Sequence, residues 1–125
     1  MAYDPNNIFA KILRGEIPCN KAYEDEYALA FHDITPQAPV HVLVIPKGEY
    51  VSFDDFSSSA PAAEVVGFYR AVQKVAAQLG LQPGGYRALS NVGRDAHQVV
   101  RHYHLHLFAG CDLGRMVKKG LAPDG

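Results

Sequence analysis

The stretch "RHYHLHLFAG", residues 101–110, places three of the six histidines of the chain at every second position. Alternate side chains of a β-strand point to the same face of a sheet, with about 6.5 to 7 Å between neighbours on that face. The stretch therefore predicts a strand that presents a row of imidazoles on one face and buries apolar side chains with the other. The imidazoles belong to His102, His104 and His106, and the apolar side chains to Tyr103, Leu105 and Leu107.

The remaining elements follow from helical and strand periods elsewhere in the chain. "VHVLVIP", residues 40–46, is apolar on both faces and predicts a central strand, in which His41 is the one polar residue. The longest helical period runs from Pro61 to Leu79, just before Gly80. The other predicted elements are a short helix within 4–18, a hairpin with strands at 21–24 and 27–33, and a strand near 86–91. Residues 53–59 have no recognisable period.

This order of elements predicts an α+β fold: an antiparallel sheet of about five strands, with one long and one short helix on one side of it. At 125 residues and 13.7 kDa the chain is expected to form one domain, 1–125. Residues 111–125 have no strong period and are expected to be a C-terminal tail.

The composition excludes several classes of function. The 12 basic and 13 acidic residues give a net charge of −1 without a run of one sign, so neither a nucleic-acid partner nor a membrane partner is expected. The two cysteines, Cys19 and Cys111, have no metal or redox spacing. No apolar run reaches the length of a membrane span and the N-terminus lacks a signal-peptide pattern, which predicts a cytoplasmic protein.

The row of histidines has one structural and two chemical interpretations. A single histidine among apolar residues is commonly a hydrogen-bonded structural group, but four imidazoles together are costly when charged and need partners when neutral. Histidines at alternate positions of a strand can bind zinc, although three in one line converge poorly on a single ion. Alternatively, one imidazole attacks an electrophile while its neighbours fix its tautomer or transfer protons. Histidine is nucleophilic at neutral pH, which favours a phosphoryl or nucleotidyl substrate.

The same residues carry a resemblance to a known family. "HYHLHLF" resembles the signature of the histidine triad (HIT) superfamily, His-x-His-x-His followed by two apolar residues. "IFAKILRGEIP", "ALAFHDITPQAPVHVLVIPK" and "YRALSNVGRDAHQ" resemble, in order and spacing, the blocks of its Hint branch, the purine nucleoside phosphoramidases. Together they cover most of residues 7–114. The resemblance implies a HIT-like fold and a purine nucleotide substrate, and no cofactor is expected.

The resemblance also implies a role for each matching position. His104 is the expected nucleophile, which forms a nucleotidyl-histidine intermediate, while His102, His106 and His41 orient it and stabilise charge on the phosphate. Asp33 is expected to accept hydrogen bonds from both ribose hydroxyls, or alternatively to cap the turn into "TPQAP". The base is expected to lie among apolar residues, each of which can equally be a core residue: Ile8, Phe9, Ile12, Phe31, Ile34 and Leu43.

The loop before the histidines completes the implied site and departs from the family pattern. Asn91 and Gln98 are expected to bind the phosphate or the leaving group, and backbone N–H groups from Gln98 to Val100 are expected to cradle an oxyanion. Val99 stands where many relatives have a serine that hydrogen-bonds the departing amine, and His97 stands where glycine is usual. The stretch "NNIFAK" lacks the Cys-x-x-Cys pair of some bacterial relatives, so no structural zinc is expected.

The predicted function is a hydrolase of purine nucleoside 5′-phosphoramidates. Three alternatives stay open: a nucleotide-binding regulatory module with little catalysis, a dinucleoside polyphosphate hydrolase of the same superfamily, and a metal-dependent histidine cluster. Proteins of the Hint branch form homodimers through the long helix and a neighbouring strand. The chain is therefore expected to form a homodimer through apolar side chains of that helix, among them Phe68, Tyr69 and Val72.

Overall fold

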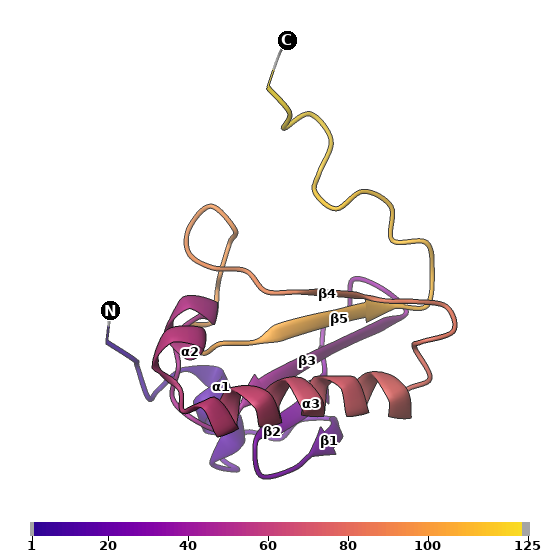
Figure 1. Cartoon of the computed structure of the whole chain (residues 1–125). Helices are drawn as coiled ribbons and strands as arrows, with labels where there is room; N and C mark the ends of the chain where they lie inside the picture. The colour runs from indigo at the N-terminus through magenta and orange to yellow at the C-terminus, as the bar shows by residue number, and fades with distance from the viewer. Residues whose placement is uncertain (1, 124–125) are drawn as a thin grey trace.

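The computed structural model describes residues 2–123, and its five strands form an antiparallel sheet in the order β1-β2-β3-β5-β4 (Figure 1). The strands are β1 (Lys21–Glu24), β2 (Ala28–His32), β3 (Val40–Pro46), β4 (Arg87–Leu89) and β5 (Leu105–Ala109). The predicted α+β class and the predicted central position of residues 40–46 are thereby confirmed.

The long helix α3 (Ala62–Gln78) covers one face of the sheet. It begins after Pro61 and ends before Leu79, within one residue of the predicted bounds. Its buried side chains recur three or four positions apart and are Phe68, Ala71, Val72, Val75 and Ala76. All of them except Ala76 pack against the buried side chains of β2 and β3 that point to this face, among them Val42 and Val44. Burial of each large apolar side chain stabilises the fold by about 1.5–3 kcal/mol, so this stripe anchors the helix.

The short helix α1 (Ile8–Leu13) lies on the opposite face of the sheet. Its Phe9 packs against the alternate positions of β2 and β3, which are Leu29, Phe31, Leu43 and Ile45. The prediction that the helices lie on one side of the sheet was therefore wrong. Both central strands are apolar on both faces, and each face needs a cover.

A second short helix, α2 (Phe53–Ser59), lies where no element was predicted. Its sequence, FDDFSSS, leaves only two apolar side chains, too few to establish a helical period. Phe56 is fully buried and its ring stacks on that of Tyr103 with 5.1 Å between centroids. The hydroxyl of Ser52 caps the helix by accepting from the N–H of Asp55. A tertiary contact, rather than a local pattern, thus fixes this helix.

Strand β5 begins later than the histidine pattern predicts. The ladder pairs Val44 with Leu105, so two further pairs in the same register would put Tyr103 opposite Pro46. Proline has no backbone N–H to donate, and the N–H of Tyr103 donates instead to the carbonyl of Tyr50 at 2.7 Å.

Two of the three histidines consequently precede the strand, and the prediction of one strand for all three was wrong. His102 and His104 lie before β5, and only His106 lies within it. The predicted alternation of faces is nevertheless confirmed. The rings of His102 and His104 contact Phe9 of α1 edge to face, with centroids 6.4 and 5.0 Å apart, whereas Tyr103 belongs to the core under α3.

The dimer surface predicted on α3 needs a correction. Phe68 is fully buried and Val72 is 8% exposed, so both belong to the core and cannot meet a partner. The outer side of the helix still carries apolar surface, because Val66 is 50% and Tyr69 is 36% exposed. These two side chains line a hollow on the helix together with Val65, Arg70, Gln73 and Lys74.

Residues 111–123 contain no helix or strand and lead away from the sheet (Figure 1). The guanidinium of Arg87 holds their first part by donating to the carbonyls of Gly114 at 2.8 Å and Arg115 at 3.1 Å. Within residues 2–123, no helix combines the length and the apolar character that crossing a membrane requires.

Candidate active site

Four histidines gather on the face of the sheet that α1 covers. His41 comes from β3 and His106 from β5, while His102 and His104 come from the segment that enters β5. Exposure is 0% for His102, 3% for His41 and 7% for His104. Every buried side-chain nitrogen and oxygen of the described residues has a hydrogen-bond partner, so these rings are held in place rather than merely enclosed.

The tautomer of His104 follows from its partner. Nδ1 of His104 lies 2.7 Å from the carbonyl oxygen of His102. A carbonyl can only accept, so Nδ1 carries the proton and Nε2 keeps its lone pair. This is the form of imidazole that attacks an electrophile without a separate base.

A chain of hydrogen bonds fixes the next two rings. The N–H of Gln37 donates to Nδ1 of His41 at 3.1 Å, so the neutral ring of His41 carries its proton on Nε2. That proton is donated to Nδ1 of His106 at 2.9 Å. The proton of His106 is therefore on Nε2, and this ring lies 5.1 Å from the ring of His104 between centroids. The chain turns His106 into a hydrogen-bond donor beside the nucleophile.

The ring of His102 is bound at both nitrogens. Nε2 donates to the carbonyl of Pro46 at 3.0 Å, which leaves Nδ1 as an acceptor. The hydroxyl of Tyr3 lies 2.6 Å from this Nδ1 and donates to it. No sequence pattern marked Tyr3, which lies outside the family blocks and 99 positions from its partner.

Burial keeps all four imidazoles neutral. Removal from water lowers the pKa of His102 to about 4, against the opposing effect of its bond to the Pro46 carbonyl. The pKa of His106 is lowered to about 4 by burial and by the neighbouring His104 and His41. Burial also lowers the pKa of His41 and of His104, and in both cases the carboxylate of Asp33 opposes the shift. At neutral pH His104 therefore retains the lone pair that nucleophilic attack requires.

The same geometry bears on the metal interpretation. Asp33, His41 and His106 each offer a ligand atom, and these atoms lie within 4.8 Å of one another. However, Nε2 of His41 carries the ring proton, because its Nδ1 accepts from the N–H of Gln37. A protonated nitrogen cannot bind an ion. The arrangement favours a hydrogen-bonded pair of imidazoles over a metal site.

Asp33 lies at the edge of the histidine cluster and makes the turn that was predicted as its alternative role. Its Oδ1 accepts from the N–H of Thr35 at 2.8 Å and from the Thr35 hydroxyl at 3.2 Å. Its Oδ2 lies 3.5 Å from Nε2 of His41, and 19% of the side chain is exposed. One carboxylate oxygen thus holds the turn, while the other faces the histidines.

The apolar residues predicted to hold the base fall into two groups. Phe9, Phe31 and Leu43 are buried in one cluster beside His104, and Ile12 and Val100 pack against it. The other two predicted residues lie outside this cluster and are exposed, Ile8 at 44% and Ile34 at 92%. Packing is enough to explain why the residues of this cluster are apolar. Ile34 is exposed instead, so its apolar surface is free for a ligand.

The loop of residues 91–100 is braced by Gln98. Its Nε2 donates to the carbonyls of Val51 at 2.7 Å and Val100 at 3.1 Å, and its Oε1 accepts from the N–H of Gly93 at 3.1 Å. The backbone N–H of Gln98 donates to the Gly93 carbonyl at 3.0 Å and is therefore already engaged, while the oxyanion cradle from the N–H groups of Val99 and Val100 stays a prediction. Asn91 is half-buried in the same loop. The phosphate contacts of Gln98 and Asn91 stay predictions.

The two departures from the family pattern lie on the surface of this loop. Val99 is 87% exposed and offers no hydrogen-bonding group. His97 is exposed and has φ of 59°, the left-handed region that favours glycine. The usual glycine at this position is thus explained by the backbone, which histidine follows at some cost.

Ser90 is a second residue that the sequence did not mark. Its hydroxyl donates to the carbonyl of His104 at 2.9 Å. Strand β4 ends at Leu89, where its backbone pairing with β5 also ends. The Ser90 side chain adds one more hydrogen bond beyond that point, to the residues that lead into β5. Ser90 thereby helps to fix the backbone of His104.

The chain is similar to known proteins over most of its length. The HIT domain family matches residues 14–113. An uncharacterised HIT-like protein of Azospirillum brasilense is 63% identical over 94% of this chain and 97% of its own. The purine nucleoside phosphoramidase of Escherichia coli is 41% identical over 91% of this chain and 96% of its own. The solved structure of a HIT family hydrolase from Clostridium thermocellum superposes with a TM-score of 0.82 at 41% identity, over 90% of this chain and 97% of that one.

Proposed function

The chain belongs to the HIT family, and we propose that it hydrolyses purine nucleoside 5′-phosphoramidates through a covalent nucleotidyl-histidine intermediate. The observation that carries the proposal is the 2.7 Å bond from Nδ1–H of His104 to the carbonyl of His102, which leaves Nε2 free to attack. The name of the Escherichia coli relative, purine nucleoside phosphoramidase, supports this substrate class.

In the first step Nε2 of His104 attacks the α-phosphorus of the substrate. A bond between Nε2 and phosphorus forms as the bond between phosphorus and the amine nitrogen breaks, and the bonding pair leaves with the amine. The amine takes up a proton as it departs, because an unprotonated amine is a poor leaving group. Val99 has no proton to give, so water supplies it. The products of this step are the free amine and a nucleotidyl group on His104.

In the second step water attacks the same phosphorus atom. A bond from the water oxygen to phosphorus forms, the bond to Nε2 breaks, and its electron pair returns to His104. The proton of the water is released, and a nucleoside monophosphate leaves. The enzyme regains the neutral tautomer of His104, because the carbonyl of His102 has held Nδ1–H throughout.

The other groups act on charge and position. Nε2–H of His106, set by its bond to His41, can donate to the phosphate oxygens as charge develops on them. The outward oxygen of Asp33 can accept from the ribose hydroxyls. The apolar cluster around Phe9 and Phe31, together with the exposed Ile34, offers a surface for a purine ring.

One observation favours a second function. Val99 is 87% exposed and apolar at the position where relatives place a hydroxyl for the departing amine. Without that donor the site retains the means to bind a purine nucleotide but lacks help for the leaving group. The second candidate is therefore a nucleotide-binding regulatory module that turns substrate over slowly.

The test is hydrolysis of a fluorogenic adenosine 5′-phosphoramidate with EDTA present. Loss of a covalent nucleophile predicts that His104→Ala lowers kcat/KM by about 10³-fold or more. His32→Ala is the matched control, because His32 follows Phe31 on β2 and its side chain points away from the histidine cluster.

The outcomes separate the candidates. Turnover that survives EDTA and depends on His104 but not on His32 supports the hydrolase and opposes the metal-dependent cluster. Absence of turnover together with tight binding of AMP supports the regulatory module. Faster cleavage of a dinucleoside polyphosphate than of the phosphoramidate supports the other hydrolase branch.

A further inference from the structure

A tyrosine from the N-terminal segment, residues 3–7, reaches the histidines at the other end of the chain. The hydroxyl of Tyr3 donates to Nδ1 of His102 at 2.6 Å, and the two rings meet edge to face with 5.6 Å between centroids. Tyr3 is half-buried in this position, and burial raises its pKa, so the hydroxyl keeps its proton over the working range of the site.

We propose that Tyr3 is a positioning residue of the active site: its hydroxyl fixes the ring of His102 and thereby the carbonyl of His102, which sets the tautomer of His104. The proposal rests on the proposed function for its effect on turnover, but its structural part does not. Tyr3 contacts none of the reacting atoms and acts only through His102.

The effect of the His102 ring on the position of the His102 carbonyl depends on how tightly this residue is held. The residue is 0% exposed, and its ring has exactly two polar atoms, each with one partner: Tyr3 at Nδ1 and the Pro46 carbonyl at Nε2. Loss of the first leaves a buried acceptor unsatisfied, which favours rotation or protonation of the ring. Because the backbone of the same residue accepts from Nδ1–H of His104, a moved His102 disturbs the nucleophile.

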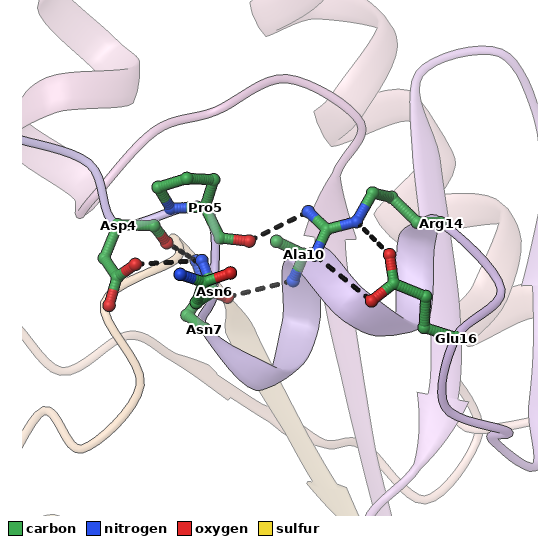
Figure 2. Close-up of polar contacts among 7 residues, drawn as sticks. All are labelled: Asp4, Pro5, Asn6, Asn7, Ala10, Arg14 and Glu16. Carbon is green, nitrogen blue, oxygen red and sulfur yellow. Dashed lines mark hydrogen bonds and ion pairs between the residues drawn. The ribbon is translucent and has the colours of Figure 1, made fainter.

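The residues that follow Tyr3 are held by hydrogen bonds among themselves and to the end of α1 (Figure 2). Asp4 accepts from the N–H of Asn6 at 2.9 Å and from Nδ2 of Asn7 at 2.7 Å, which closes a turn directly before α1. Arg14 reaches back from the end of α1 and donates to the carbonyl of Pro5 at 2.8 Å. The residues joined in this network are Asp4, Pro5, Asn6, Asn7, Ala10, Arg14 and Glu16. The turn ties the segment to a helix whose Phe9 packs on His104.

The test replaces Tyr3 by phenylalanine, which keeps the ring contact and removes only the hydroxyl. In protein labelled with ¹⁵N-histidine, the Nδ1 resonance of His102 is expected to shift in Tyr3→Phe. With the adenosine 5′-phosphoramidate, kcat is expected to fall about tenfold while KM stays within about twofold, because the base and ribose contacts are unchanged. Tyr23→Phe is the matched control, since Tyr23 lies on the edge strand β1 and its hydroxyl donates to Asp25, just beyond the end of that strand.

A double-mutant cycle separates positioning from general stability. If Tyr3 acts through His102, Tyr3→Phe has little further effect on kcat in the His102→Ala background. An equal fall of kcat in both backgrounds, or an unchanged kcat in Tyr3→Phe, overturns the proposal. If the wild type has no turnover, the proposed hydrolase activity is wrong, but the ¹⁵N resonance still tests the role of Tyr3. An Nδ1 signal of His102 that does not shift in Tyr3→Phe overturns that role.

Discussion

Nε2 of His41 lies 2.9 Å from Nδ1 of His106, on the diagonal of a ladder in which His41 stands opposite Phe108. One proton joins the two rings. A further proton on this pair would make two N–H groups face each other, and the burial of the rings also opposes the added charge. The pair is therefore stable only when both rings are neutral, and this neutrality governs how the protein responds to acid.

The free energy of unfolding is expected to fall as the pH drops from about 6.5 to about 4. The pKa of His102 and that of His106 are about 4 in the folded protein, against 6.5 for a free histidine. Between these values the unfolded chain binds protons that the folded chain does not, so stability is full above pH 6.5 and is lost as pH falls. The slope is at most about 1.4 kcal/mol per pH unit for each fully shifted histidine, and less for the half-buried His106.

Urea unfolding at a series of pH values measures this slope. His106→Asn is expected to reduce this slope, and His97→Asn, which removes an exposed histidine, is the control. Equal slopes in the wild type and in His106→Asn would contradict the neutral pair.

The contact between α3 and the β1–β2 turn predicts that Gly67→Ala destabilises the protein. A Cβ at Gly67 would overlap Cγ and Cδ2 of the Tyr27 ring, so the helix or the ring would have to move. The free energy of unfolding is expected to fall by about 1–3 kcal/mol. In the Tyr27→Ala background the clash is absent, and the same substitution is expected to stabilise the helix by about 0.5–1 kcal/mol. Thermal or urea unfolding of the four proteins checks this reversal of sign.

The position of Asp33 predicts an effect on recognition of the sugar. Asp33→Asn removes the charge but keeps an oxygen for the N–H of Thr35, so the turn is expected to survive. Loss of a charged acceptor for the ribose hydroxyls is expected to raise KM about tenfold. Steady-state kinetics with ribo and 2′-deoxyribo substrates measure this effect. A preference for ribose that is as strong in Asp33→Asn as in the wild type would argue against a ribose contact.

Restoring a hydroxyl at Val99 is expected to speed the departure of poor leaving groups. Val99 is 87% exposed, so Val99→Ser costs little stability, within about 0.5 kcal/mol. A donor at this place is expected to raise kcat/KM about tenfold for alkylamine phosphoramidates, and less for substrates whose amine leaves readily. Val99→Ala is the matched control because it shortens the side chain without adding a donor. Equal rates for the serine and alanine variants would show that the position does not serve the amine.

The outer side of α3 predicts a homodimer. Val66 and Tyr69 are 50% and 36% exposed on a helix whose other face is buried. The wild type is expected to sediment at twice the 13.7 kDa chain mass, and Val66→Asp is expected to shift it toward the monomer. Val92→Asp makes the same change on an exposed loop residue and serves as the control. A wild type that sediments only as a monomer at high concentration would contradict the dimer.

Much of the fold was predictable because its signals are local. The alternation of residues 101–110 predicted which side chains share a face, and the stripe through Phe68 and Val75 predicted α3 within one residue at each end. A period of two or of 3.6 residues is a property of the sequence itself. Helix α2 was missed for the same reason, since seven residues with one buried phenylalanine contain no period.

The sequence by itself determined the sheet, the long helix and the gathering of four histidines on one face. Only the tertiary structure decided which nitrogen of each ring carries the proton and where β5 begins. Pro46 acts on both, because it has no N–H to extend the ladder and its carbonyl fixes the ring of His102, 56 positions away. Tyr3 likewise supplies a donor to a histidine 99 positions away, and Gln37 supplies one to His41 from the loop before β3. Hydrogen-bond partners of this kind are set by distance in space, and no local period of side chains records them.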